Sequence, residues 1–175
     1  MDIKIEHGVY SDLNEIENLY NDLNDSLEVG VNYPGWKKGV YPTRNNAKEG
    51  IKNNNLFIAR INNKIIGSII LNHNPEKGYS YGKWKYDNDY TSILVVHTLV
   101  VHPSFFKKGI GYKLMEFAEN YGRRNNIKSI RLDVYEKNIP AIKLYERCGY
   151  TYISTVDLGL ESYGLKWFKL YEKLL

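Results

Sequence analysis

The order of secondary-structure elements along this 175-residue chain predicts an α+β domain with a mixed β-sheet. Three observations support this prediction: amphipathic helical patterns, short runs of β-branched and aromatic residues, and Gly, Pro and Asn residues at the boundaries between them. Together they give the order βααβββαβαββ. The sequence contains no internal repeat and no low-complexity linker, so we expect residues 1–175 to form a single domain.

The chain is expected to open with one strand and two helices. Residues 3–9 predict a short strand, and Ser11 can cap a helix that extends to about Leu27. A loop rich in Pro and Gly follows, after which Thr43 can cap a second helix that ends near Asn53. The apolar face of the first helix is expected to hold Leu13, Ile16, Leu19, Tyr20, Leu23 and Leu27.

A hairpin and a long buried strand are expected in the middle of the chain. Residues 56–61 and 64–71 flank the pair Asn62-Asn63, and Asn tolerates the positive φ that a tight hairpin needs. Residues 72–90 are polar and aromatic and show no clear period. Residues 91–101 are rich in β-branched residues, which is typical of a strand buried on both faces.

The second half of the chain is expected to contain two helices and three strands. From Gly109 the pattern becomes helical, and Asn138 can cap a second helix that has Pro140 in its first turn. Gly149 is positioned to end that helix. The strands are expected at residues 128–134, 150–156 and 165–175.

The composition excludes several classes of protein. It is 43% hydrophobic and 25% charged, which is ordinary for a globular protein. A single cysteine excludes a disulfide framework and a Cys-based zinc site, and we expect no metal. No apolar run approaches the roughly 18–20 residues of a membrane span, and the first residues lack the features of a signal peptide. We therefore expect a cytoplasmic protein without a membrane partner.

Charge is unevenly distributed along the chain. Residues 1–36 contain one basic and eight acidic residues, a net charge of −7, and the remainder carries +11. A basic body suits an anionic partner such as a phosphorylated cofactor. The acidic segment is either a solvated face or a feature that favours a cationic acceptor. The total of +4 is modest and no aromatic-basic motif is present, so we expect no nucleic-acid partner.

A candidate phosphate site follows the long strand. Lys107, Lys108, Gly109 and Gly111 lead into the start of a helix. Glycines let the backbone approach a ligand closely, and a helix N-terminus offers unpaired N–H groups and the positive end of its dipole. Alone, this pattern is equally consistent with a plain glycine turn, because it lacks the Walker and dinucleotide fingerprints.

A second motif favours the phosphate-site interpretation over the plain glycine turn. The segment DVYEKNIPAIKLYERCGYTYI fits N-x-x-A-x-x-L-Y-x-x-x-G-F through Asn138, Ala141, Leu144, Tyr145, Gly149 and, in place of Phe, Tyr150. With the loop upstream, it resembles the GNAT acyltransferase superfamily, whose loop motif is R/Q-x-x-G-x-G/A. Gly109 and Gly111 match that loop, whereas Phe106 stands where the family has Arg or Gln. The resemblance, close over residues 91–156, implies the GNAT fold: a central mixed, mostly antiparallel β-sheet flanked by about four helices.

The resemblance implies acetyl-CoA as co-substrate and no metal. Backbone groups of Leu99, Val100 and Val101 would bind the pantetheine arm, and one N–H there would polarise the thioester carbonyl. The pyrophosphate would be held by the amides of Lys107, Lys108, Gly109, Ile110, Gly111 and Tyr112. A lysine of this loop would compensate for Phe106. Asn138 would bind the cofactor arm, cap its helix, or do both.

The resemblance also suggests catalytic residues. Tyr145 is the candidate general acid, because a phenol with a pKa ordinarily near about 10 can protonate the leaving thiolate; the alternative is a packing tyrosine. For the base, the family often has a Glu on the fourth strand, where this chain has His97, expected on the same face as Val95 and Leu99. A structural histidine, Glu136 or bulk water are the alternatives.

Aromatic residues in two segments are expected to form the acceptor site. The candidates for substrate binding are Tyr33, Trp36, Tyr41, Tyr81, Trp84 and the acidic Glu136. Rings can form an amphipathic slot for a small ligand. An alternative of equal weight is that these rings cover the edge of the sheet or pack against a second copy of the chain in a homodimer.

Two functions remain open at this point. The leading hypothesis is an acetyl-CoA-dependent N-acetyltransferase that acts by direct attack of a primary amine of a small molecule or peptide. The alternative is a catalytically inactive CoA-binding sensor or structural protein on the same fold. Phe106 and the missing strand carboxylate favour the alternative, while Asn138 and Tyr145 oppose it.

Overall fold

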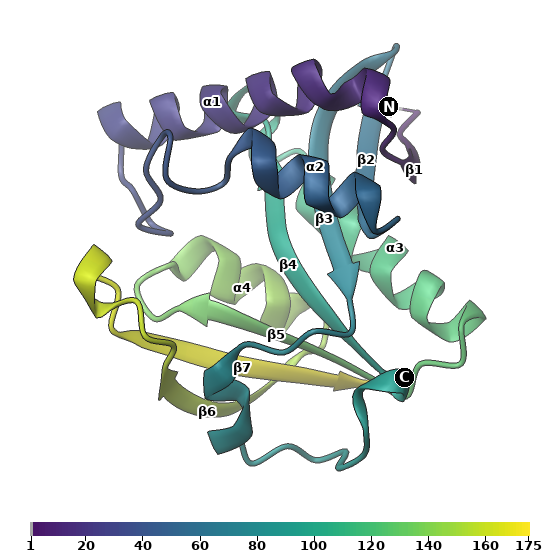
Figure 1. The fold of residues 1–175 in the computed structure, drawn as a ribbon, viewed down its shortest axis with the longest axis vertical. Coiled ribbons are helices and arrows are strands. Elements are labelled where there is room, and N and C mark those ends of the chain that lie inside the picture. The colour runs from purple at the N-terminus through teal and green to yellow at the C-terminus, as the bar shows by residue number, and fades with distance from the viewer. Residues whose placement is uncertain (1) are drawn as a thin grey trace. The chain divides into compact units, whose positions relative to one another are not determined.

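The computed structural model describes residues 2–175, which form seven strands and four α-helices joined by loops and short 3-10 turns (Figure 1). The strands are β1 (Lys4–His7), β2 (Leu56–Ile61), β3 (Lys64–Asn72), β4 (Ile93–Val101), β5 (Ser129–Tyr135), β6 (Thr151–Asp157) and β7 (Trp167–Leu174). The helices are α1 (Leu13–Val29), α2 (Arg44–Lys52), α3 (Ile110–Arg124) and α4 (Ile139–Arg147). This confirms the expected order. Within these residues, no helix combines the length and the apolar character that a membrane crossing requires.

The seven strands form one mixed sheet in the order β1-β2-β3-β4-β5-β7-β6. The β4–β5 pairing is parallel, whereas β1–β2, β2–β3, β5–β7 and β6–β7 are antiparallel, which confirms the predicted sheet type. The backbone nevertheless groups into two compact units. Unit 1 comprises residues up to Asn32, Trp36–Leu71 and His97–Phe117, and unit 2 comprises Tyr33–Gly35, Asn72–Val96 and Ala118–Leu175. The single-domain expectation therefore stays a prediction.

The helix boundaries in unit 1 follow from local capping, with one difference from expectation. Thr43 is the N-cap of α2, as predicted, and its backbone N–H donates to the side-chain oxygen of Asn46 at 2.7 Å. The prediction that Ser11 caps the first helix is wrong, because a short 3-10 turn precedes α1 and Asp12 occupies the N-cap. The Asp12 carboxylate instead accepts the backbone N–H of Val9 at 2.9 Å.

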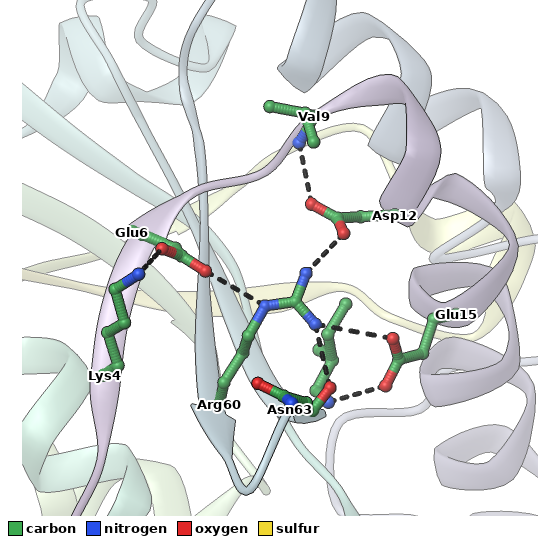
Figure 2. A network of polar contacts seen from close by, with 8 residues as sticks. Lys4, Glu6, Val9, Asp12, Glu15, Arg60 and Asn63 are labelled. Carbon is green, nitrogen blue, oxygen red and sulfur yellow. Dashed lines mark hydrogen bonds and ion pairs between the residues drawn. The ribbon is translucent and has the colours of Figure 1, made fainter.

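Arg60 fastens the N-terminal elements to the β2–β3 hairpin (Figure 2). The predicted turn is confirmed, since Asn62 and Asn63 have φ values of 48° and 65°. The Arg60 guanidinium contacts the carboxylates of Glu6 at 3.0 Å, Glu15 at 3.5 Å and Asp12. Burial opposes the guanidinium charge, but these carboxylates outweigh it and raise the pKa of Arg60.

The core of unit 1 lies where α1 and α2 pack side by side (Figure 1). The predicted apolar face of α1 is buried in it. The buried members are Leu13, Ile16, Leu19, Tyr20, Leu23, Leu27, Ala47, Ile51, Leu56, Ile58, Ile65, Ile70 and Val100. Burial of this much apolar surface is the main force that holds the helices against the strands.

The central strand of unit 2 is β5, which has a different neighbour along each edge. Parallel pairing joins Ile93–Val96 of β4 to Ser129–Leu132 of β5. Antiparallel pairing with β7 extends over all seven residues of β5, from Ser129 to Tyr135. The last three residues of β5 therefore lie beyond its parallel pairing.

The two faces of the unit 2 sheet carry different elements. Tyr171 of β7 donates from its hydroxyl to Glu146 of α4 at 3.0 Å, so α4 covers that face. Leu170, the next residue along the chain, points to the opposite face because side chains alternate in a strand. There it packs in a buried cluster with Tyr79, which belongs to segment 72–92.

A buried carboxylate ties segment 72–92 to this second face. Glu172 of β7 is 2% exposed and lies 3.5 Å from the Arg131 guanidinium of β5, which is 3% exposed. The Glu172 carboxylate accepts hydrogen bonds from the Ser129 hydroxyl at 2.8 Å and from the backbone N–H groups of Lys85 at 2.7 Å and Tyr86 at 3.3 Å. The negative charge is thereby compensated within the protein.

Arg131 makes the complementary contacts from the same position. Its guanidinium stacks over the Trp84 ring at 4.2 Å and donates to the hydroxyl of Tyr90 at 2.9 Å and to the carbonyl of Tyr86. Arginine suits this position because its planar group stacks and donates several hydrogen bonds at once. Both partners of the ion pair thus hold the same loop segment.

Arg131→Met should destabilise the protein by about 3–5 kcal/mol, because it leaves Glu172 charged and buried without its partner. Urea unfolding followed by circular dichroism measures the change. Arg123→Met is the matched control: its guanidinium is 52% exposed and 3.7 Å from Glu119, so its loss should cost less than about 1 kcal/mol. Equal stabilities of the two variants would contradict this account.

Candidate active site

The carboxyl-terminal part of β4, in unit 1, departs from regular strand geometry. Thr98 has a φ of 48°, in the left-handed region that a β-branched residue rarely adopts. Burial still alternates residue by residue through this part of β4, and the expectation that His97 and Leu99 share a face stays a prediction. His97, Leu99 and Val101 are half-buried, and Val100 is buried.

The aromatic loop between α1 and α2 is fixed to this irregular position. The Tyr41 hydroxyl is hydrogen-bonded to the Thr98 hydroxyl, and the Asn24 amide donates to the Tyr41 carbonyl at 3.2 Å. The Trp36 ring meets the Tyr41 ring edge-on at 5.3 Å. Two of the predicted acceptor residues, Trp36 and Tyr41, are therefore brought together, whereas Tyr33 belongs to unit 2 and is 40% exposed.

Asn24 and Thr98 were not predicted as site residues. Asn24 is 2% exposed and follows Leu23 on the buried face of α1. A polar residue on an apolar helical face is a signal that the sequence contains. The φ of Thr98 has no comparable sequence signal, because nothing in the run of β-branched residues marks an irregularity.

The predicted phosphate loop contains two residues in the left-handed region of backbone conformation. Lys107 and Gly109 have φ values of 59° and 80°, and a Cβ at Gly109 would meet nothing within 4 Å. Helix α3 begins at Ile110, and the N–H of Lys113 donates to the Gly109 carbonyl at 3.0 Å. The N–H groups of residues 110–112 precede the first such bond and therefore have no acceptor within the helix.

The two lysines of this loop differ in their surroundings. The Lys108 ammonium donates to the Ser104 carbonyl at 2.9 Å and lies 5.0 Å from the centre of the Phe105 ring. Lys107 is exposed, and Phe106 is 44% exposed although it is apolar. Of the two lysines, Lys107 is therefore the better placed to compensate for Phe106.

Gly109→Ala should cost about 1–2 kcal/mol of stability, because an L residue with a side chain is strained in the left-handed region. Gly109→Asn should cost less, since Asn tolerates this conformation. Urea unfolding of the two variants against the wild type tests the difference. A Gly109→Ala protein as stable as the wild type would show that the loop does not need this conformation.

Helix α4 in unit 2 has the boundaries that the sequence predicts. The Asn138 side chain accepts the N–H of Ala141 at 3.4 Å and caps the helix, with Pro140 in the first turn. Gly149 has a φ of 83° after the last turn, and its N–H donates to the Glu146 carbonyl at 3.0 Å. The cap interpretation of Asn138 is confirmed, and its role toward a cofactor stays a prediction.

The candidate acid, Tyr145, is buried within α4. It is 7% exposed, and its ring lies 6.3 Å from that of Tyr150. Burial, followed by the neighbouring Glu119 carboxylate, raises the pKa of Tyr150 well above its ordinary value. Tyr150 therefore stays neutral.

Glu136, the other base candidate, is half-buried after β5, and its backbone N–H donates to the Trp167 carbonyl at 3.0 Å.

The aromatic residues of segment 72–92 are used in different ways. Tyr81 is 77% exposed. Trp84 is half-buried, donates from its indole N–H to the Tyr79 carbonyl at 2.7 Å and stacks on Arg131. These contacts favour the packing alternative for Trp84, while the role of Tyr81 toward a substrate stays a prediction.

One acidic residue of this unit was not anticipated. Asp133 on β5 is half-buried and accepts the Tyr79 hydroxyl at 2.7 Å. An acidic residue inside the apolar strand segment SIRLDVY is the signal that could have identified it. Among residues 2–175, no cluster of three or more His, Cys, Asp or Glu side chains is arranged to bind a metal.

Comparison with known proteins identifies the family. The model described as the Acetyltransferase (GNAT) family matches residues 16–150, which is most of the chain. The chain belongs to the GNAT family. This GNAT protein is 30% identical to the streptothricin acetyltransferase of Escherichia coli over 77 residues, which cover 44% of each protein. The match thus spans less than half of that relative.

Solved structures confirm the GNAT fold. A GNAT acetyltransferase of Streptococcus agalactiae 2603 superimposes with a TM-score of 0.77 at 19% identity, covering 99% of this chain and 95% of that one. The yncA protein of Salmonella typhimurium, solved with its cofactor acetyl-CoA, gives a TM-score of 0.71 at 15% identity, with 99% and 94% coverage. At these identities the likeness shows the fold alone.

Proposed function

We propose that this GNAT protein transfers the acetyl group of acetyl-CoA to a primary amine. The observation that carries the proposal is helix α4, which has Asn138 as its cap and buries Tyr145 two turns later. These are the positions at which the family's second motif binds the cofactor arm and protonates the leaving group. The acetyl-CoA complex of the yncA protein and the acetyltransferase name of the E. coli relative support the same function.

The phosphate loop fits the cofactor that this function requires. Its left-handed Gly109 leaves the backbone open to a ligand, and the first N–H groups of α3 suit a pyrophosphate. We assign pyrophosphate binding to the backbone of residues 107–112 and pantetheine binding to that of Leu99, Val100 and Val101. When bound, acetyl-CoA supplies the acetyl group as a reactive thioester.

The proposed chemistry is direct attack without a covalent enzyme intermediate. The acceptor arrives as an ammonium ion and loses one proton to a base, for which we propose His97. The neutral nitrogen then forms a C–N bond to the acetyl carbon while the C–S bond breaks. Tyr145 donates its phenolic proton to the departing thiolate and is reprotonated by the proton that the new amide nitrogen releases.

Thiol release from acetyl-CoA tests this function directly. We expect release with at least one of three amines: streptothricin, spermidine, and a short peptide with a free N-terminus. Mass spectrometry should show one acetyl group on the amine. The exposed Phe106 in the phosphate loop favours the inactive sensor instead. A melting temperature raised by acetyl-CoA, together with no turnover of any of these amines, would favour the sensor over the enzyme.

Tyr145→Phe should lower kcat by about 10²–10⁴-fold, the range expected for loss of a general acid, with the KM for acetyl-CoA nearly unchanged. Steady-state kinetics with the best of the three amines provide the measurement. Tyr163→Phe is the control, because Tyr163 is 62% exposed and lies outside the proposed machinery. A kcat for Tyr145→Phe equal to that of the control would remove Tyr145 from the mechanism.

A further inference from the structure

The backbone of Thr98 on β4 has a conformation that its own side chain disfavours. Its φ of 48° lies in the left-handed region, where a β-branched residue is an outlier. Outliers of this kind persist only where surrounding contacts hold them, and they concentrate at active sites. Leu99 and Val100, to whose backbone we assign the pantetheine arm, follow Thr98 directly. The conformation of Thr98 therefore sets the direction of the backbone groups that come after it.

A contact from the loop between α1 and α2 holds Thr98. The Tyr41 hydroxyl is hydrogen-bonded to the Thr98 hydroxyl, 57 residues further along the chain, and both residues belong to unit 1. Thr98 is 8% exposed and Tyr41 is half-buried. A buried hydroxyl that loses its partner costs more free energy than the bond contributes. The pair therefore stabilises one position of the Thr98 side chain.

Tyr41 is itself held in place through both its backbone and its ring. Its N–H donates to the Lys37 carbonyl at 3.0 Å, and its carbonyl accepts the side-chain amide of Asn24, a residue only 2% exposed, at 3.2 Å. The Trp36 ring meets its ring edge-on at 5.3 Å. The Tyr41 hydroxyl thus reaches Thr98 from a fixed position, which a residue that positions another one requires.

A second tyrosine pair offers a comparison of the same chemistry. The hydroxyls of Tyr86 and Ser92 lie 3.1 Å apart, and both residues are half-buried. Ser92 directly precedes β4, whereas Thr98 lies inside the strand. Neither Tyr86 nor Ser92 has a positive φ. The hydroxyl pair at Thr98 is thus distinguished by the backbone conformation that it accompanies.

Resting on the acetyl transfer proposed above, we infer that Tyr41 is a positioning residue that acts through the Thr98 hydroxyl on the backbone of β4. The two hydroxyls keep Thr98 in the left-handed region, and this conformation aims a following N–H at the thioester carbonyl. An N–H that stabilises the developing oxyanion acts in the transition state, so its misplacement lowers kcat. In this role Tyr41 does not bind the amine.

Steady-state kinetics of Tyr41→Phe, with the best amine among streptothricin, spermidine and the free peptide, test the inference. We expect kcat to fall about tenfold to a hundredfold, less than the loss of a whole oxyanion donor, and the KM for the amine to stay within about twofold. Tyr86→Phe is the matched control, because it removes the other hydroxyl pair. The urea midpoints of the two variants should shift by similar amounts, so that lost stability does not explain the difference in kcat.

Two results of that experiment would overturn the inference. One is a kcat of Tyr41→Phe equal to that of Tyr86→Phe. The other is an effect confined to the KM for the amine, which would make Tyr41 a direct substrate contact.

Substitutions of Thr98 test the backbone conformation itself and decide the matter if Tyr41→Phe does not fold. Thr98→Val keeps the β-branch without the hydroxyl, so kcat should fall as in Tyr41→Phe, and the double variant should lose no more than either single one. Thr98→Gly should retain more of kcat than Thr98→Val, because glycine adopts the left-handed region without strain. Equal kcat values for the Val and Gly variants would contradict the inference.

Failure of the inference is distinguishable from failure of the proposed function. If the wild type acetylates none of the three amines, the proposed function fails and the inference falls with it. If the wild type is active and the variants give the contrary results named above, only the role of Tyr41 and Thr98 is overturned.

Discussion

The buried ion pair between Arg131 and Glu172 is the constraint on which the organisation of unit 2 depends. Both groups are removed from water, so each requires the other and the hydrogen bonds around them. Nearly all of those bonds come from segment 72–92, which has no regular strand or long helix of its own. The ion pair thus gives an irregular segment a fixed position on the sheet, and with it the contact between Tyr79 and Asp133.

In unit 1, pairing between an arginine and carboxylates also holds elements together. Arg60 gathers three carboxylates and holds α1 and the N-terminal strand against the β2–β3 hairpin. The phosphate loop and the irregular end of β4, with Thr98 bound to Tyr41, belong to this unit. The residues assigned to the cofactor backbone contacts therefore rest on unit 1.

Most of the fold could be predicted from the sequence because its signals are local. Asn62-Asn63, Thr43, Asn138 and Gly149 each act within a few residues, and all four were correctly assigned. Ser11 was misassigned because a 3-10 turn over Tyr10–Asp12 precedes α1 and moves the start of the α-helix to Leu13. The pairs Arg131–Glu172 and Tyr79–Asp133 join segments 41 and 54 residues apart, and no local pattern specifies such partners. The candidate site was thus predictable where motifs define it and not where distant segments meet.

A crystal structure of the protein with CoA and the N-acetylated form of its best amine would test the central claim most directly. The account predicts the CoA sulfur within about 3 Å of the Tyr145 hydroxyl, the distance of a hydrogen bond, and the pyrophosphate against the backbone of residues 107–112. A sulfur remote from Tyr145, or a pyrophosphate bound away from that loop, would contradict it.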